Sequence, residues 1–504
     1  MGCKKIVNIK KEVQNLLKEV GPGQMSNTAY DTAWIARLGE IDWNLSSKAL
    51  NWLCENQLPD GSWGAKEPFY YHDRVISTLA AMIALTYRGR RKQDKTLIEK
   101  GLLALENITS GATQGLAADP NGATVGFEMI VPSLVAEAEE LGIIKQQGER
   151  ILGRMKHLRE QKMQKLAGLK INRHYTPAFS LELAGPDGHE ILDVDNLQEL
   201  NGSVANSPSA TAYFVHKILI GDESALRYLK ESIKNRNGGA PFASPFNVFE
   251  RAWVLWNILI TPSLAKDPDI KKQIQPHIQF LTQAWRPGKG VGFSNEYTPC
   301  DGDDTSVTFD VTARFGKPLD LATLLSFEDK EYFRCYPLEV NPSIGANIHT
   351  LSSLQQAGLE NSHPTIVKVL EFLKKTIQPE GYWIDKWHIS PYYTTAHAIV
   401  ACKDIDEDLC QKAIKWILRT QNANGSWGSF GNSTAEETAY SIQALMIWKL
   451  NGNKIPKQNI NLAVHWLKNN NDKVHSPLWI SKALYCPHLV VKSTILSALA
   501  LCEE

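Results

Sequence analysis

Three carboxylates fall within four positions at Asp301-Gly302-Asp303-Asp304, on a segment with turn character before it and helix character after it. Like charges this close cannot all ionise cheaply, so the pKa of at least one carboxyl group should rise. A carboxylic acid that keeps its proton at neutral pH is available as a Brønsted acid, which can transfer that proton to a base. The same residues could instead form a solvated acidic loop. The rest of the sequence is needed to distinguish a catalytic acid from a solvated acidic loop.

The composition limits the elements that can position these carboxylates. The 504 residues are 43% hydrophobic and 21% charged, which is typical of a globular chain with a large core in two or three domains. Lys+Arg and Asp+Glu number 54 each, which argues against an electrostatic nucleic-acid binder. The sequence shows no apolar run that would predict a transmembrane segment and no secretory signal at its start. Scattered cysteines without a CxxC pair indicate reduced thiols in a cytoplasm.

Hydrophobic periodicity predicts helices along almost the whole chain, and the period-2 alternation of strands is nearly absent. Gly21-Pro22-Gly23 ends the first of these helices. The expected helices cover residues 4–20, 74–87, 96–107, 128–141, 208–219, 248–261, 363–376, 394–403, 407–420, 433–449 and 460–469. The sequence therefore predicts an all-α protein.

A short motif with glutamine, glycine and tryptophan recurs along the chain. Residues 57–64 return as residues 421–428, with a shorter copy at 378–383 and a degenerate one at 198–204. We expect each glutamine to bond to backbone at the N-terminus of the next helix, with the indole stacked on that helix. These segments would then be clamps between helices, without a direct role in chemistry. Copies toward both ends of the chain imply at least two helical barrels built from the same hairpin unit.

These repeats, together with the DxDD motif, resemble the class II terpene cyclases. The chain is most similar to a bacterial two-domain class II diterpene cyclase, of the copalyl or halimadienyl diphosphate synthase kind. Matching segments run nearly end to end, at residues 29–34, 72–74, 126–128, 132–134, 207–212, 249–251, 385–388 and 436–440.

The resemblance implies a fold of two α-helical barrel domains, called β and γ. Domain β would consist of residues 1–25 and 240–504 and would carry the DxDD motif, and domain γ would be inserted as residues 26–239. The active site would lie at the interface of the two domains, which is a usual place for a deep pocket.

The activity that the resemblance implies is protonation-initiated bicyclisation of geranylgeranyl diphosphate. The product would be a bicyclic diterpenyl diphosphate of copalyl, halimadienyl or clerodane type. The DDxxD and NSE-type metal motifs of class I synthases, which ionise the diphosphate, are missing from the sequence. The diphosphate would therefore be retained, and a downstream class I synthase or a phosphatase would act on the product.

The resemblance assigns the transferred proton to Asp303, with Asp301 and Asp304 tuning that carboxyl group by hydrogen bonding and charge. His349 stands where triterpene cyclases carry a histidine and plant relatives an asparagine. A histidine at this place can orient the acid and fix its more acidic proton. The alternative for His349 is a hydrogen-bonded core histidine without a catalytic role.

The same resemblance places residues around the substrate. Lys165 matches a lysine that binds the diphosphate, and Asn347 is counted with the substrate-binding residues. Mg²⁺ is expected with the diphosphate. Its ligands stay unassigned, because Ala118-Asp119-Pro120 replaces the acidic stretch that plant relatives carry.

Aromatic faces can stabilise a carbocation without reacting with it. Trp387-His388 with Tyr392-Tyr393 is the strongest cluster, because a turn at Pro391 should hold these rings at a barrel mouth. The full set of aromatic candidates is Trp253, Phe293, Tyr297, Phe333, Tyr336, Trp387, Tyr392 and Tyr393.

Two residues depart from the pattern of plant enzymes that make ent-copalyl diphosphate. Those enzymes hold a water with a His–Asn pair, where this sequence has Phe179 and Phe242. Neither ring can accept a proton, so either the terminating base lies elsewhere or the cation is not quenched where those enzymes quench it. A rearranged skeleton of halimadienyl or clerodane type is expected.

Other classes of protein stay open at this point. A farnesyl diphosphate cyclase of drimenyl type would differ in its substrate, and squalene-type triterpene cyclases are longer chains with more repeats. A protein prenyltransferase β subunit needs an Asp–Cys–His zinc site, and the Asp-x-Cys spacing for it is absent around Cys300-Asp301. A non-catalytic isoprenoid-binding protein would bind without turnover and would have no reason to keep three clustered carboxylates.

Overall fold

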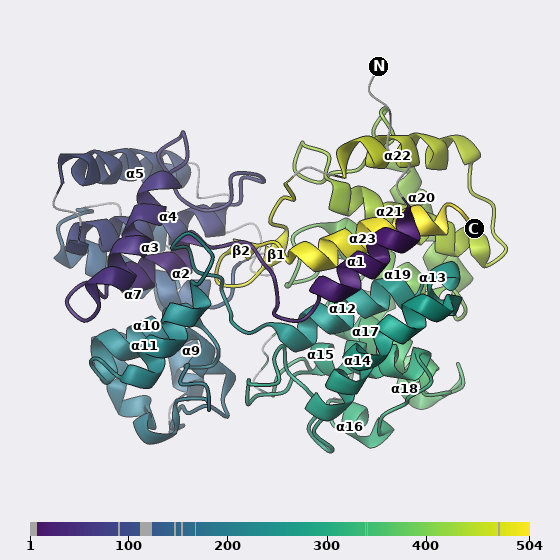
Figure 1. The fold of residues 1–504 in the computed structure, drawn as a ribbon, viewed down its shortest axis with the longest axis horizontal. Coiled ribbons are helices and arrows are strands. Elements are labelled where there is room, and N and C mark those ends of the chain that lie inside the picture. Colours follow the sequence, from purple (N-terminus) through teal and green to yellow (C-terminus); the bar gives the residue numbers. More distant parts are fainter. Residues whose placement is uncertain are drawn as a thin grey trace.

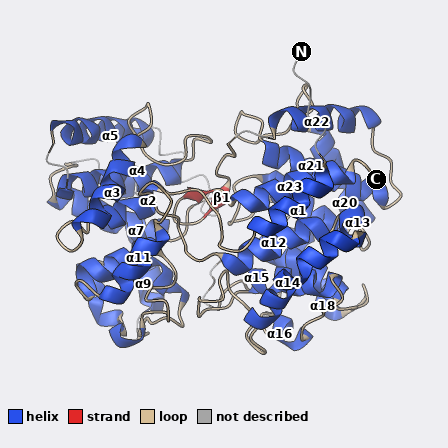
Figure 2. Ribbon diagram, in the orientation of Figure 1, coloured by secondary structure: helices blue, strands red, loops and turns tan. Residues whose placement is uncertain are grey.

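The computed structural model describes all residues except 1–7, 89–90, 111–122, 146–147, 153–154, 167, 338, 340 and 472–473. Helices dominate these described residues, as Figure 2 shows. The two short strands β1 (Trp479–Ile480) and β2 (Leu484–Tyr485) pair antiparallel in a small hairpin. The all-α fold class expected from the periodicity is therefore confirmed.

The helices form two lobes that lie side by side (Figure 1). The first lobe contains α2 (Ala29–Ala36), α3 (Trp43–Glu55), α4 (Tyr71–Arg88), α5 (Lys92–Ser110), α7 (Phe127–Glu140), α8 (Gly148–Leu152), α9 (Met155–Leu166), the 3₁₀ segments η1 (Thr176–Ala184), η2 (Pro186–Ile191) and η3 (Val194–Asn196), α10 (Pro208–Tyr213), the π-helical turn η4 (Phe214–Ile218) and α11 (Glu223–Ser232).

The second lobe combines the first helix of the chain with all the later ones (Figure 1). It contains α1 (Ile9–Glu19), α12 (Asn247–Leu259), α13 (Pro262–Lys266), α14 (Pro268–Ala284), α15 (Gly302–Arg314), α16 (Leu321–Leu325), α17 (Ile344–Gln356), α18 (Pro364–Thr376), α19 (Pro391–Cys402), α20 (Glu407–Arg419), α21 (Ala435–Leu450), α22 (Lys457–Asn470) and α23 (His488–Leu501).

Helix α1 belongs to the second lobe because of its amphipathic pattern. Its apolar residues Ile9, Val13, Leu16 and Leu17 recur at helical spacing and are buried, and the helix packs against α14 and α23. The chain then crosses to the first lobe, and the buried carboxylate of Glu250 accepts hydrogen bonds from three backbone N–H groups in the crossing segment 21–24. The inserted domain and its boundaries at residues 25 and 239 stay a prediction.

The repeated motifs connect neighbouring helices. Gln57 and Gln421 each donate from Nε2 to a backbone carbonyl, that of Leu97 in α5 at 2.8 Å and that of Asn459 in α22 at 2.9 Å. Each acceptor lies in the helix after the next one, and not at the N-terminus of the next helix as expected. The indoles differ from the expectation. Trp63, Trp383 and Trp427 each donate from Nε1 to a carbonyl in the last turn of the preceding helix, at 2.8 to 2.9 Å. The motif therefore satisfies open carbonyl groups at the end of one helix while its glutamine binds a helix further along the chain.

The β1–β2 hairpin extends from the second lobe to the first (Figure 1). The carbonyl of Ser481 accepts a hydrogen bond from the N–H of Val125 at 2.8 Å, and the N–H of Leu484 donates to the buried carboxylate of Asp73 at 2.9 Å. Every described cysteine is a free thiol. Among the described helices, none combines the length and the apolar character needed to cross a membrane.

Candidate active site

The DxDD segment begins helix α15, and Asp301 is its N-cap. Oδ1 of Asp301 accepts hydrogen bonds from the backbone N–H groups of Asp303 at 3.0 Å and Asp304 at 2.7 Å. A carboxylate at this position satisfies N–H groups that have no partner inside the helix. Gly302 fits tightly, because a Cβ atom there would lie 2.3 Å from the carbonyl oxygen of Arg334. The motif thus sets the start of the helix as well as its chemistry.

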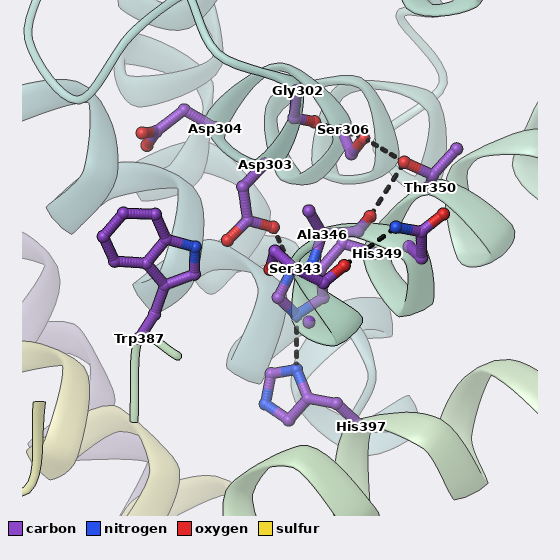
Figure 3. A network of polar contacts seen from close by, with 12 residues as sticks. Gly302, Asp303, Asp304, Ser306, Ser343, Ala346, His349, Thr350, Trp387 and His397 are labelled. Atoms are coloured by element: carbon purple, nitrogen blue, oxygen red, sulfur yellow. Dashed lines mark hydrogen bonds and ion pairs between the residues drawn. The ribbon is translucent and has the colours of Figure 1, made fainter. Parts of the chain in front are cut away.

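The carboxylate of Asp303 meets the imidazole of His349 across α15 and α17. Asp303 Oδ1 lies 2.5 Å from His349 Nδ1, and the side chain of His349 is only 3% exposed. Figure 3 shows the Asp303 carboxylate pointing toward His349, whereas that of Asp304 points away. The hydroxyls of Ser306 and Thr350, 2.9 Å apart, tie the same two helices together. The pairing expected for His349 is present.

The two flanking carboxyls carry the raised pKa values. Burial, together with the charge of the nearby Asp303 carboxyl, raises the pKa of Asp301 to about 7. Burial, followed by the charge of Asp301, raises the pKa of Asp304 well above its ordinary value. Asp301 Oδ2 and Asp304 Oδ1 are buried without a hydrogen-bond partner among the described atoms, which also favours the protonated forms. Below about pH 7, Asp303 therefore stands beside two neutral acids.

The three aspartates form one wall of a cavity of about 890 Å³ that both lobes line. A cavity of this size is typical of a small-molecule site. Many of the other lining residues are aromatic. The aromatic lining residues are Phe179, Phe242, Phe246, Phe249, Trp253, Phe293, Tyr297, Tyr336, Phe372, Trp387, Trp479 and Tyr485.

Several residues expected around the substrate lie on this wall, namely Phe179, Phe242, Trp253, Tyr297 and Trp387. Trp253 stacks on Phe249 at 3.9 Å between ring centroids and meets the edge of His349 at 5.6 Å. Tyr297 stacks on Phe293 at 4.2 Å. These rings surround the place where Asp303 faces the cavity.

Other expected residues lie elsewhere. Tyr392 packs against Trp416 at 4.8 Å and does not line the cavity, because successive residues of a helix point in directions about 100° apart. Asn347 exchanges hydrogen bonds of 2.8 and 3.0 Å with the backbone of Phe333, so its amide holds a loop in place. Phe333 and Tyr393 are buried behind the lining residues.

The predicted diphosphate ligand Lys165 lies on helix α9, and its side chain is outside the described part of the structure. Two other lysines line the cavity, and each forms an ion pair with a lining carboxylate: Lys162 with Glu128 and Lys386 with Glu339. In the described part of the chain, no group of three or more His, Cys, Asp or Glu side chains is arranged to hold a metal ion.

Phe179 and Phe242 are brought together from segments 63 positions apart. Their ring centroids lie 6.2 Å apart at an angle of 71°, and Phe242 packs on Tyr485 at 4.3 Å. This end of the cavity is therefore an aromatic wall, as expected if no His–Asn pair holds water there.

Two residues near the site carry no sequence signal of their own. Lys482, in the β1–β2 turn, is completely buried and donates to Glu182 at 2.7 Å and to Ser207 and Ser209 at 2.9 and 2.7 Å. His397 on α19 lies behind His349, with its Nδ1 2.8 Å from His349 Nε2 (Figure 3). Neither residue stands in a local motif, so only the folded structure reveals them.

A helical cavity lined by aromatic rings, with a DxDD acid segment on one wall, is the arrangement of a class II terpene cyclase. The family model described as the squalene-hopene cyclase C-terminal domain matches residues 337–474. The ent-copalyl diphosphate synthase from Streptomyces platensis has a similar structure, with a TM-score of 0.79 and 25% identity over 98% of this chain and 100% of that one.

Two relatives cover nearly the whole chain. The type B diterpene cyclase of Mycobacterium tuberculosis is 51% identical over 95% of this chain and 96% of its own length. The (+)-kolavenyl diphosphate synthase of Herpetosiphon aurantiacus is 29% identical over 97% of this chain and 96% of its own length. The chain belongs to the bacterial class II diterpene cyclases, and it is an enzyme of that family.

Proposed function

We propose that this cyclase protonates the terminal alkene of geranylgeranyl diphosphate with the carboxyl group of Asp303. The O–H bond of Asp303 breaks, a C–H bond forms, and a tertiary carbocation is left on the substrate. Two C–C bonds then close the two rings, and a base finally removes one proton. The reaction is an isomerisation, so no oxidant or reductant is needed.

The observation that carries this proposal is the contact of 2.5 Å between Asp303 and His349 on the wall of an aromatic cavity. A neutral His349 that donates to one carboxylate oxygen leaves the other oxygen to hold the transferred proton. The same hydrogen bond stabilises the carboxylate that remains after proton transfer. Around it, aromatic rings exclude water and offer negative π-faces to the cation.

We propose that the diphosphate stays on the product. Lys162 and Lys386 line the cavity and, together with Lys165, are the cationic side chains assigned to the diphosphate. Mg²⁺ commonly binds through one or two carboxylates plus substrate phosphates. Glu128 and Glu339, which line the cavity singly and not as a cluster, fit that mode, so Mg²⁺ would be bound mainly through the substrate.

The product we propose has a rearranged skeleton of halimadienyl or clerodane type. Phe179 and Phe242 exclude a proton-accepting water from their end of the cavity, and they prolong the life of the cation. Hydride and methyl shifts can then compete with proton loss. Similar proteins carry the names of different products. One relative is named as a (+)-kolavenyl diphosphate synthase, and one similar structure is named as an ent-copalyl diphosphate synthase. A copalyl-type product is the alternative.

The retained diphosphate implies a consumer of the product, and we propose a class I synthase or a phosphatase in the same cytoplasm. Scattered free thiols support a reducing location.

Incubation with C15, C20 and C30 isoprenoid substrates, followed by phosphatase treatment and mass spectrometry, tests the proposal. A bicyclic C20 alcohol that appears only after phosphatase treatment is the expected result, and chelation of Mg²⁺ should slow its formation. A C15 product of drimenyl type or a cyclised C30 hydrocarbon would contradict the assigned substrate. Binding of the C20 diphosphate without turnover would identify a non-catalytic isoprenoid-binding protein, and release of inorganic diphosphate would refute its retention.

A further inference from the structure

His397 lies at the end of a line of three polar groups that starts in the cavity. Asp303 Oδ1 lies 2.5 Å from Nδ1 of His349, and Nε2 of His349 lies 2.8 Å from Nδ1 of His397. Nε2 of His397 is buried and has no hydrogen-bond partner among the described atoms. The line therefore ends inside the protein.

The surroundings of His397 hold its ring in place. The indole of Trp256 on α12 stacks on it at 4.1 Å between centroids and an angle of 16°. The titratable groups around it are His349 on α17, Tyr440 on α21 at 5.7 Å, Tyr393 on its own helix at 4.3 Å, and the nearby His388. Burial, followed by His349 and His388, lowers the pKa of His397 well below its ordinary value, so this imidazole stays neutral at neutral pH.

The missing partner of Nε2 determines where the proton of His397 lies. A buried N–H group without an acceptor is rarer in proteins than a buried acceptor without a donor. The single proton of the neutral ring therefore belongs on Nδ1, which faces His349. His349 must then accept at Nε2, so its own proton lies on Nδ1 and is donated to Oδ1 of Asp303.

We propose that His397 is a positioning residue that keeps His349 in the Nδ1–H form and thereby leaves the acid proton on Oδ2 of Asp303. This inference rests on the proposed function, in which Asp303 is the acid. If His349 took the proton of Asp303, it would carry N–H groups on both nitrogens, and its Nε2–H would meet the Nδ1–H of His397. His397 thus opposes an imidazolium–carboxylate pair, which could no longer protonate an alkene.

Two substitutions distinguish a role of His397 as a hydrogen-bond donor from a role in packing alone. His397→Phe keeps an aromatic ring against Trp256 and removes the donor. His397→Asn can place an amide N–H where Nδ1 now stands, because both nitrogens are bonded to Cγ. The exposed His465 on α22 supplies a control, His465→Phe.

The first measurement is the pH dependence of kcat. We expect His397→Phe to lose about tenfold or more in kcat with little change in KM, and its falling limb to move toward lower pH by about one unit. His397→Asn should recover most of this loss, and His465→Phe should behave as the wild type. Equal losses in the Phe and Asn variants with an unchanged pH profile would overturn the proposal, since that pattern indicates packing only.

The second measurement does not depend on turnover. ¹⁵N spectra of histidine-labelled protein report which ring nitrogen carries the proton, and the signals of His349 can be identified by their absence in His349→Gln. We expect the Nδ1–H form of His349 in the wild type and in His397→Asn, and a mixture in His397→Phe. An Nε2–H or doubly protonated His349 in the wild type would overturn the proposal, whereas an inactive wild type with the expected spectrum would contradict only the proposed function.

Discussion

The ammonium group of Lys482 lies 4.6 Å from the centroid of the Phe179 ring. Phe179 lines the cavity, so one of its neighbours is a cation held in the turn of the β1–β2 hairpin. The ammonium group of Lys482 donates hydrogen bonds to Glu182, Ser207 and Ser209, which all lie in the first lobe. The ring that we place beside the carbocation is therefore positioned by a buried ion pair that joins the lobes.

Replacement of Asp303 by asparagine tests the acid directly. Asp303→Asn keeps the shape of the side chain and removes the transferable proton, so turnover should fall by roughly 10³-fold or more. Substrate binding, measured by fluorescence or calorimetry, should change little. The exposed Asp408 offers the control Asp408→Asn, which should retain full activity. Near-normal turnover in Asp303→Asn would rule out this residue as the acid.

Activity should depend on the protonation of Asp301. Its carboxyl group has a pKa of about 7, so kcat should fall as the pH rises through 7, because the new negative charge holds the proton of Asp303 more tightly. Asp301→Asn stays neutral and keeps an oxygen that can cap α15. Its kcat should therefore fall less steeply above pH 7. A pH profile identical to that of the wild type would show that Asp301 does not control the acid.

The same carboxyl group should make stability depend on pH. A folded-state pKa of about 7, above the ordinary 3.8, means that the folded protein binds a proton that the unfolded chain releases. Stability should therefore fall as the pH rises from about 4 to about 7, by up to about 4 kcal/mol at about 1.4 kcal/mol per pKa unit. Chemical denaturation at pH 5 and pH 8 should show a smaller difference for Asp301→Asn than for the wild type.

The skeleton of the product should depend on Phe179 and Phe242. The double variant Phe179→His/Phe242→Asn introduces a pair that can hold a water near the bicyclic cation. We expect NMR of the dephosphorylated product to show a shift from a rearranged skeleton toward an unshifted labdane with an exocyclic methylene. The half-exposed Phe430 provides the control Phe430→His. An unshifted labdane from the wild type, unchanged in the double variant, would refute the rearrangement.

The buried pair of Lys482 and Glu182 should be far more costly to break than an exposed one. Both side chains are 0% exposed, so Lys482→Met leaves a buried carboxylate without its cation and should destabilise the protein by about 3–5 kcal/mol. The double variant Lys482→Met/Glu182→Gln should recover part of that loss. The exposed pair of Lys234 and Glu231 gives the comparison, and Lys234→Met should cost less than about 1 kcal/mol. Thermal or urea unfolding of the wild type and these three variants measures the difference.

Local pattern was sufficient for the helices and for the acid motif. Helical periodicity predicted helices such as residues 407–420, because hydrogen bonds within a helix join residues close in sequence. Asp301 stands at the start of α15 for a similar reason, since an N-cap bonds to N–H groups two and three positions later. The recurring glutamine and glycine likewise predicted the clamps between helices.

Contacts between segments far apart in the sequence could be identified only from the tertiary structure. The sequence marked His349 only through its resemblance to a family, and the contact with Asp303, 46 positions away, follows from the packing of α15 against α17. Neighbouring residues in one helix also differ: Tyr393 packs near His349, whereas Tyr392 faces Trp416. No local pattern states which face of α19 points to the cavity.

By itself, the sequence determined the helical class, the family and the acid motif. Each of these depends on residues that lie near one another in the sequence or recur at fixed spacing. The folded chain decided the neighbours of those residues. Lys482 and His397 stand in no motif, and they reach Phe179 and His349 only because the hairpin and α19 pack beside them. The physical reason is that burial and side-chain contacts depend on three-dimensional packing, which brings together groups tens or hundreds of positions apart.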